Sequence, residues 1–212
     1  MMLFPLLKKD FMIVKKPVLI MFLFIILIPP FMRWRTPEFT GVLGFTLSVL
    51  FAVYILLQFV SQKEYQFPKA AALLCATPFP RKMMVLSKYI FCMVIYMSCC
   101  IVYGIETLLI PGLGTFDIKL FALMFLVTSV FIGIYWPVLY KLGYEKTRFF
   151  VVIYVVSPYI LPRLLRMDSL NLAFFSMLSP YLIYGSIILI GLAILAISTY
   201  ISMRIYDKAD LA

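Results

Sequence analysis

A series of long apolar runs constrains the fold of this chain more than any other feature, and residues 39–60 form the clearest one. A helix needs about 20 mostly apolar residues to cross a bilayer. The runs are residues 17–32, 39–60, 83–110, 120–140, 149–161 and 180–203. We expect Pro29 and Pro30 to end or kink the first run at its outer end. The pattern predicts an all-α, polytopic membrane protein with six transmembrane helices in a single domain, residues 1–212.

Composition excludes a water-soluble fold. Of the 212 residues, 65% are hydrophobic and 13% are charged, whereas soluble domains average about 45–50% and 25%. No polar block is large enough to form a separate catalytic domain. The chain has no histidine, which excludes catalytic and metal sites that depend on this residue. Its four cysteines show no CxxC spacing and are interpreted as buried or lipid-facing apolar residues.

The positive charge predicts the orientation in the membrane. The chain has 19 Lys and Arg against 9 Asp and Glu, a net charge of +10. In a membrane protein such an excess is typical of cytoplasmic loops rather than of a nucleic-acid site. With six spans, 14 basic residues fall at the two termini and in the loops after spans two and four, and five fall in the other loops. We therefore expect both termini in the cytoplasm.

Two segments outside the spans are expected to lie along the membrane. Residues 3–16 mix apolar and basic positions, which suits an interfacial helix in the headgroup layer. Simple flanking charge would give a similar pattern. Residues 171–203 would form a helix of about 50 Å, which is too long for a core of about 30 Å. Because Pro180 offers a break, we expect a short re-entrant or interfacial helix before span six.

The loop after span two carries the strongest local signals. Pro68 suits the first turn of a helix, and residues 69–76 are good helix formers. Residues 77–80, Thr-Pro-Phe-Pro, then stop the helix sharply. We interpret this as a short helix at the cytoplasmic membrane face that could pass force between a soluble partner and two membrane helices. An ordinary loop is the alternative.

Three short motifs resemble one family. In residues 77–90, Pro78, Arg81, Lys88 and Tyr89 match the segment after the coupling helix in permease subunits of type-2 ABC exporters, the ABC-2 family transporter proteins. Lys9-Asp10-Phe11 is similar to that family's N-terminal element, and Tyr206-Asp207-Lys208 is similar to its tail. The chain departs from the pattern at Thr77, where leucine is common. It also lacks the acidic pair and tryptophan usual before the coupling helix, apart from Glu64.

The resemblance implies a permease subunit that carries out no chemistry of its own. The chain contains no G-x-x-x-x-G-K-[ST] phosphate loop, so ATP and Mg²⁺ would be bound by a separate ABC ATPase. A second permease subunit, identical or related, would complete the path in the bacterial cytoplasmic membrane. The expected cargo is a peptide or an amphipathic, lipid-like molecule, as in peptide export or antimicrobial peptide resistance. The residues expected to couple to the ATPase are Glu64, Phe67, Pro68, Thr77, Pro78, Arg81 and Lys82, and those expected in the interfacial helix are Lys9, Asp10 and Phe11.

One acid falls near the end of a span. Glu106 lies 18 residues after Lys88, a separation of about 27 Å in a helix. With Lys88 at the inner interface, Glu106 lies at the outer one, either as a cargo contact at the exit or as an ordinary interfacial acid.

Two rival functions are considered. A membrane-embedded enzyme would need histidine, a zinc site or an aspartate pair, and Asp117 and Asp168 both fall in outer loops. An ATP-independent, ion-coupled carrier or channel is the alternative to an exporter. It would need charged or polar groups near the membrane midplane, and these spans have almost none.

Overall fold

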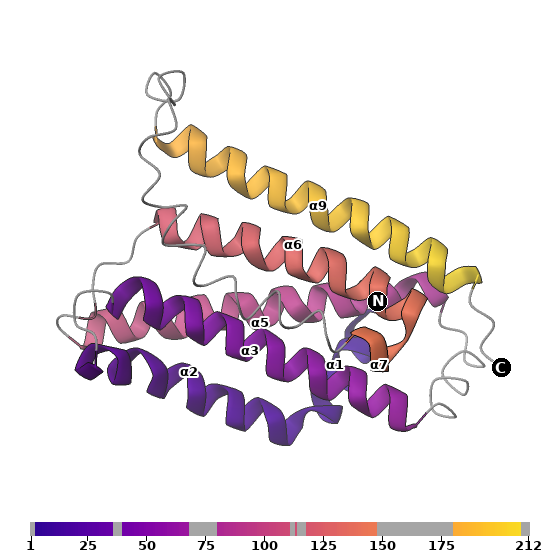
Figure 1. Ribbon diagram of the computed structural model, residues 1–212, viewed down its shortest axis with the longest axis horizontal. Helices are drawn as coiled ribbons and strands as arrows, with labels where there is room; N and C mark the ends of the chain where they lie inside the picture. The colour runs from indigo at the N-terminus through magenta and orange to yellow at the C-terminus, as the bar shows by residue number, and fades with distance from the viewer. Residues whose placement is uncertain are drawn as a thin grey trace.

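In the computed structural model the residues described are 3–35, 40–67, 80–110, 113, 118–147 and 180–208. Within these ranges all regular structure is helical, and the helices lie side by side as a bundle (Figure 1). Their bounds are α1 Leu3–Ile13, α2 Lys15–Arg35, α3 Thr40–Gln66, α5 Arg81–Leu109, α6 Ile118–Leu142, α7 Tyr144–Thr147 and α9 Pro180–Lys208.

Five of these helices, α2, α3, α5, α6 and α9, are long and apolar enough to cross a membrane. They confirm five of the predicted spans, and each helix extends beyond its predicted run at one or both ends. The remaining predicted span, 149–161, lies outside the described residues. The expected coupling helix over residues 68–76 and the expected re-entrant helix before Pro180 also lie outside them.

The two prolines of the first span do not end it. Helix α2 continues through Pro29 and Pro30 as far as Arg35, so of the two expected effects, an end or a kink, the helix does not end there. Pro29 is buried against Gly44 of α3, where an added Cβ would lie 3.2 Å from the Cα of Pro29. Transmembrane helices tolerate proline because neighbouring helices support the interrupted turn, and Gly44 allows that neighbour to approach.

Helices α6 and α9 pack side by side and run in the same direction (Figure 1). A Cβ added at Gly191 of α9 would lie 2.6 Å from the Phe125 ring of α6. Further along both helices, the rings of Tyr140 and Tyr206 lie 5.1 Å apart. Because later residues of α6 meet later residues of α9, the end of α6 and the start of α9 lie at opposite ends of the bundle.

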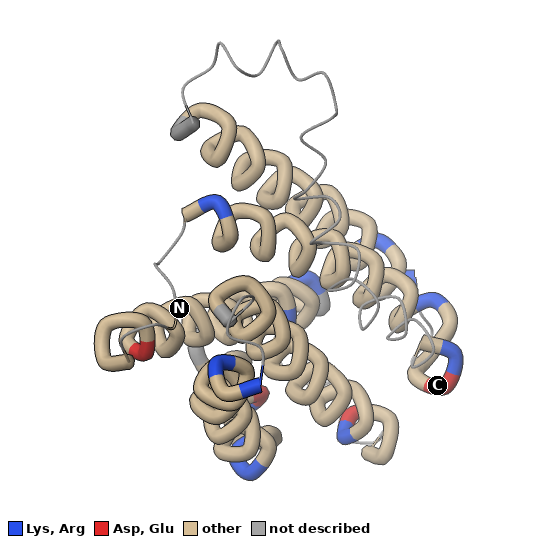
Figure 2. Tube along the Cα trace, turned by 60° about the vertical axis from the view of Figure 1, so that its left-hand side comes forward, with Lys and Arg blue, Asp and Glu red and all other residues tan. Residues whose placement is uncertain are grey.

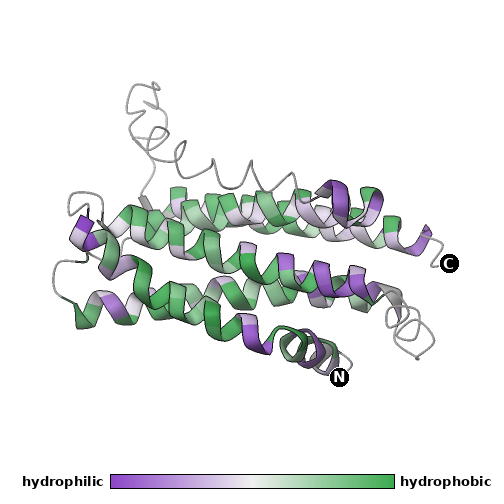
Figure 3. Cartoon of the chain, turned by 60° about the horizontal axis from the view of Figure 1, so that its bottom comes forward, coloured by the Kyte–Doolittle hydropathy of each residue, from purple (hydrophilic) through white to green (hydrophobic). Residues whose placement is uncertain are grey.

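The two ends of the bundle differ from its middle. Figure 3 shows hydrophobic residues along the helices and hydrophilic residues gathered mainly at the end that carries α1 and the last turns of α9. Lys and Arg likewise lie mostly near helix ends (Figure 2). We call the end that carries α1, α7, the start of α5 and the last turns of α3 and α9 the charged end. Helix α1 and the last turns of α9 thus lie at the same end of the bundle.

Candidate functional site at the charged end

Lys88 links three helices at the charged end. Its ammonium group donates hydrogen bonds to Asp10 of α1, at 3.1 Å, and to the carboxylate of Glu64 in the last turns of α3. Lys88 is 4% exposed and Asp10 is fully buried. A buried ammonium group is tolerated only when acids compensate it. Lys88, predicted as a charge at the inner interface, is also the buried centre of an ion cluster of Asp10, Glu64 and Lys88.

Asp10 belongs to the inward face of α1. Leu6, Asp10 and Val14 follow each other at four-residue spacing and are all buried, as expected for one helical face. Lys9 also contacts the Asp10 carboxylate, at 3.2 Å, and the ring of Phe11 packs edge-on against Phe91 of α5 at 4.9 Å. Asp10 and Phe11 therefore help to dock α1 against the bundle, whereas Lys9 contacts Asp10 within the same helix.

A second set of contacts holds the last turns of α3 from the opposite side. The Tyr65 hydroxyl donates a hydrogen bond to Glu145 at 2.8 Å, and the Tyr65 ring stacks on Tyr144 at 5.5 Å. Gly143, with a φ of 79°, makes the turn that brings α7 into this position, a backbone angle that glycine adopts without strain. The last turns of α3 are thus fixed to α1 and α5 on one side and to α7 on the other.

Tyr89, the neighbour of Lys88, extends the connection to α6 and α9. Its hydroxyl lies 2.7 Å from the Ser198 hydroxyl and 2.8 Å from the Ser202 hydroxyl. Ser198 also donates a hydrogen bond to the carbonyl of Gly133, at 2.6 Å. The Lys88-Tyr89 pair therefore contacts α1 and α3 through its lysine and α9 through its tyrosine.

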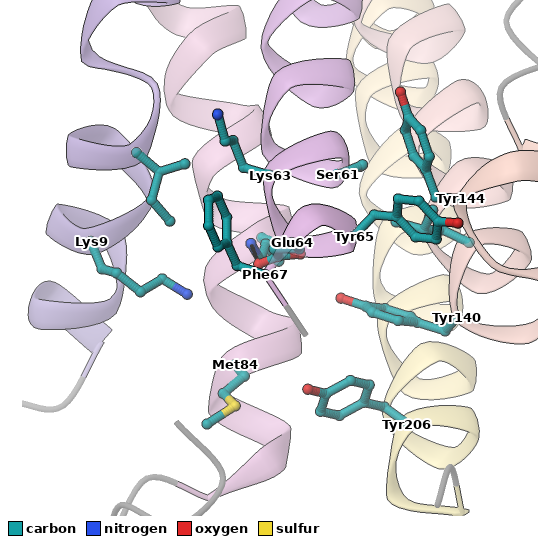
Figure 4. A pocket seen from close by; sticks show the side chains of 13 residues that line it. Lys9, Ser61, Lys63, Glu64, Tyr65, Phe67, Met84, Tyr140, Tyr144 and Tyr206 are labelled. Carbon is teal, nitrogen blue, oxygen red and sulfur yellow. Dashed lines mark hydrogen bonds and ion pairs between the residues drawn. The ribbon is translucent and has the colours of Figure 1, made fainter. Parts of the chain in front are cut away.

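A pocket of about 490 Å³ opens beside the ion cluster (Figure 4). Lys9 approaches it from α1, the Tyr140 and Tyr206 hydroxyls point into it from the opposite side, and Glu64 lies between them (Figure 4). The aromatic lining was not predicted from the sequence, although Tyr206 belongs to the C-terminal motif. The other described lining residues are Ile13, Ser61, Lys63, Tyr65, Phe67, Met84, Lys88, Leu139 and Tyr144.

The predicted ATPase-coupling residues are only partly described. Phe67 follows the end of α3 and is 58% exposed, with the Lys63 ammonium group 5.6 Å from its ring centre. Lys82 is exposed in the first turn of α5, and Arg81 is the first residue of that helix. Pro68, Thr77 and Pro78 lie outside the described residues. The described members flank the connection between α3 and α5.

Glu106 lies at the other end of α5, in its last turn. It is 7% exposed, and neither carboxylate oxygen has a hydrogen-bond partner in the described part of the chain. One turn earlier, the Tyr103 hydroxyl donates a hydrogen bond to the carbonyl of Gly41 at 3.0 Å. The structure therefore separates Glu106 from the ion cluster by most of the length of α5.

Comparison with known proteins gives one match. The family model for "ABC-2 family transporter protein" matches residues 5–207. No curated protein and no solved structure matches the chain. The family match covers the first two motifs and the third as far as Asp207, and it confirms the resemblance inferred from the sequence. The chain therefore belongs to the ABC-2 transporter family, as a membrane subunit of an ABC transporter.

Proposed function

We propose that this chain is the membrane-spanning subunit of an ATP-driven exporter and lines the path for a peptide or an amphipathic, lipid-like cargo. A separate ABC ATPase binds ATP and Mg²⁺ and is coupled to the chain through the connection between α3 and α5. The observation that carries this proposal is the ion cluster of Asp10, Glu64 and Lys88. It joins the last turns of α3, just before that connection, to α5 and α1.

The ion cluster gives ATP-driven movement a route into the membrane. A displacement of residues 68–79 by the ATPase pulls on the end of α3, and Glu64 passes the displacement to Lys88. Lys88 shares it with α1 through Asp10, and Tyr89 shares it with α9 through Ser198. ATP shifts the equilibrium between two arrangements only if the ATPase binds nucleotide differently in each.

The proposed topology has six spans with both termini in the cytoplasm. Helices α6 and α9 lie side by side in the same direction, so the chain leaves α6 at the charged end and enters α9 at the other. This parallel arrangement supports the predicted span 149–161 as the sixth crossing. The basic residues of the charged end support a cytoplasmic location for it. A second permease subunit, identical or related, completes the path in a bacterial cytoplasmic membrane.

Glu106 is the proposed contact for cargo at the outer exit. Its carboxylate is buried at the end of α5 opposite the ion cluster, without a hydrogen-bond partner among the described residues. Acids inside membranes are commonly functional because burying their charge is costly. A cationic group on the cargo would compensate this carboxylate during release.

The coupling is tested by assembly with the ATPase encoded in the neighbouring reading frame. Charge reversal at Arg81 combined with Glu64→Ala is expected to weaken co-purification of that ATPase and to lower ATP hydrolysis by the complex. Lys119→Glu, at the opposite end of α6, is the matched charge-reversal control. Unchanged co-purification and hydrolysis in the double variant would contradict the coupling.

Purified chain in vesicles distinguishes the exporter from an ion-coupled carrier or channel. The exporter requires both the ATPase and ATP to move cargo. Movement of cargo by the chain alone, driven by an ion gradient, would identify a carrier.

A further inference from the structure

The pocket beside the ion cluster has the size and position of a ligand site. Its volume of about 490 Å³ lies within the range of about 300–1,000 Å³ that is usual for small-molecule pockets. It is lined by residues near the ends of four spans, among them Lys63, Tyr140 and Tyr206. This places the pocket at the depth of one membrane interface, where lipid headgroups lie.

The charges around the pocket favour an anion. The acids Glu64 and Asp10 are both compensated by Lys88, and Asp10 also contacts Lys9. Lys63 is exposed and contacts the neutral Gln66 side chain, at 3.2 Å, and no carboxylate among the described residues. Among the lining residues the three lysines, Lys9, Lys63 and Lys88, outnumber the one acid, Glu64.

Hydrogen-bond donors and apolar walls complete the chemistry. The hydroxyls of Tyr140 and Tyr206 point into the pocket opposite Lys9 (Figure 4), and a tyrosine hydroxyl can donate to a phosphate oxygen. Ile13 and Met84 supply apolar wall, and the neighbouring Met12 of α1 is 63% exposed. A ligand with an anionic head and an apolar tail satisfies both kinds of surface, whereas a free inorganic anion satisfies only one.

We propose that this pocket binds the phosphate headgroup of an anionic phospholipid, drawn from the leaflet at the charged end. Lys9 and Lys63 supply positive charge on one side, and the hydroxyls of Tyr140 and Tyr206 supply hydrogen bonds on the other. The acyl chains leave along the exposed apolar side of α1. Basic pockets between membrane helices bind anionic headgroups in this way. Lipid binding does not require the ATPase, so the result of this test is independent of the proposed exporter function.

The test uses the purified full chain in neutral detergent, titrated with dioleoyl phosphatidylglycerol and with dioleoyl phosphatidylcholine. Native mass spectrometry measures the dissociation constant of each lipid. We expect the wild type to prefer phosphatidylglycerol and Lys63→Gln to weaken that binding about fivefold, from the usual contribution of one lysine at a membrane surface. Lys141→Gln, an exposed lysine of α6 outside the pocket, loses the same charge and is expected to bind like the wild type.

Three results would overturn the proposal. Equal affinity for the two lipids would show that the pocket does not recognise an anionic headgroup. An equal loss in Lys63→Gln and Lys141→Gln would show attraction to overall charge rather than to the pocket. An affinity for glycerol 1-phosphate equal to that for phosphatidylglycerol would show that a soluble phosphate, and not a lipid, is the ligand. Lys9 also contacts Asp10. The lipid affinity of Lys9→Gln is therefore interpreted only if the unfolding temperature of this variant matches that of the wild type.

Discussion

Lys88 and Asp10 lie 3.1 Å apart across α5 and α1, and both are almost completely buried. The pair anchors the first helix of the chain to the bundle. Asp10 uses one carboxylate oxygen for both Lys88 and Lys9, and its other oxygen has no hydrogen-bond partner among the described residues. A buried pair that is only partly satisfied stabilises a fold weakly compared with an apolar core. This weak net stabilisation supports the proposed role of the pair in transmitting movement.

Removing one partner of the pair is expected to destabilise the protein strongly. Lys88→Met leaves the Asp10 charge buried and uncompensated by its main partner, which lowers the free energy of unfolding by about 3–5 kcal/mol. The double variant Asp10→Leu with Lys88→Met removes both charges and is expected to recover most of that loss. Thermal unfolding in detergent measures both. A double variant as unstable as Lys88→Met would contradict the pairing.

Tyr89→Phe tests the connection between α5 and α9. The substitution removes a hydroxyl that bonds Ser198 and Ser202 and leaves the buried Ser202 hydroxyl without this partner. The expected loss of stability is about 1–3 kcal/mol. Chemical unfolding of the two proteins measures it, with Tyr200→Phe on the exposed side of α9 as the control. Equal losses in the two variants would argue against the network.

The parallel packing of α6 and α9 depends on Gly191. A Cβ at this position would meet the buried Phe125 ring at 2.6 Å, whereas a Cβ at Gly185 meets nothing within 4 Å. Gly191→Leu is therefore expected to lower stability by about 1–3 kcal/mol through overpacking, and Gly185→Leu to have little effect. Unfolding temperatures in detergent provide the comparison. A tolerated Gly191→Leu would mean that α9 packs elsewhere in the membrane.

Single cysteines test the six-span topology. Lys8→Cys, Glu145→Cys and Lys208→Cys are expected to react with a membrane-impermeant maleimide only after the inner membrane is opened. Leu182→Cys, at the start of α9, is expected to react in intact cells with a permeable outer layer. If the cysteines at positions 145 and 182 react from the same side of the membrane, the chain does not cross the membrane between them.

The sequence predicts the spans well because length and apolarity alone determine whether a helix can cross a bilayer. Five of the six predicted spans are helices in the described part of the chain. The sequence of one apolar run does not show that its helix continues through Pro29 and Pro30, because Gly44 of the neighbouring helix accommodates Pro29. The support that a second helix gives to a proline cannot be detected from the sequence of one apolar run.

The site could be predicted only as separate motifs. Lys9-Asp10-Phe11, Lys88-Tyr89 and the tail near Tyr206 were each recognised, but their meeting at one end depends on how the helices pack. Lys88 was placed at the interface because its position near the start of a span is typical of a flanking charge. Only the approach of Asp10 and Glu64 reveals that it is buried, and those residues lie 78 and 24 positions away along the chain.

The most direct test of ATP-driven movement through the ion cluster places a fluorophore on α1. Met12, which is exposed, is replaced by cysteine in a Cys75→Ser background, labelled with an environment-sensitive dye, and reconstituted with saturating ATPase. The account predicts a fluorescence change on adding ATP that is lost in Glu64→Gln, while Lys141→Gln keeps it. No fluorescence change in the protein with an intact ion cluster, or an equal change in Glu64→Gln, would contradict the account.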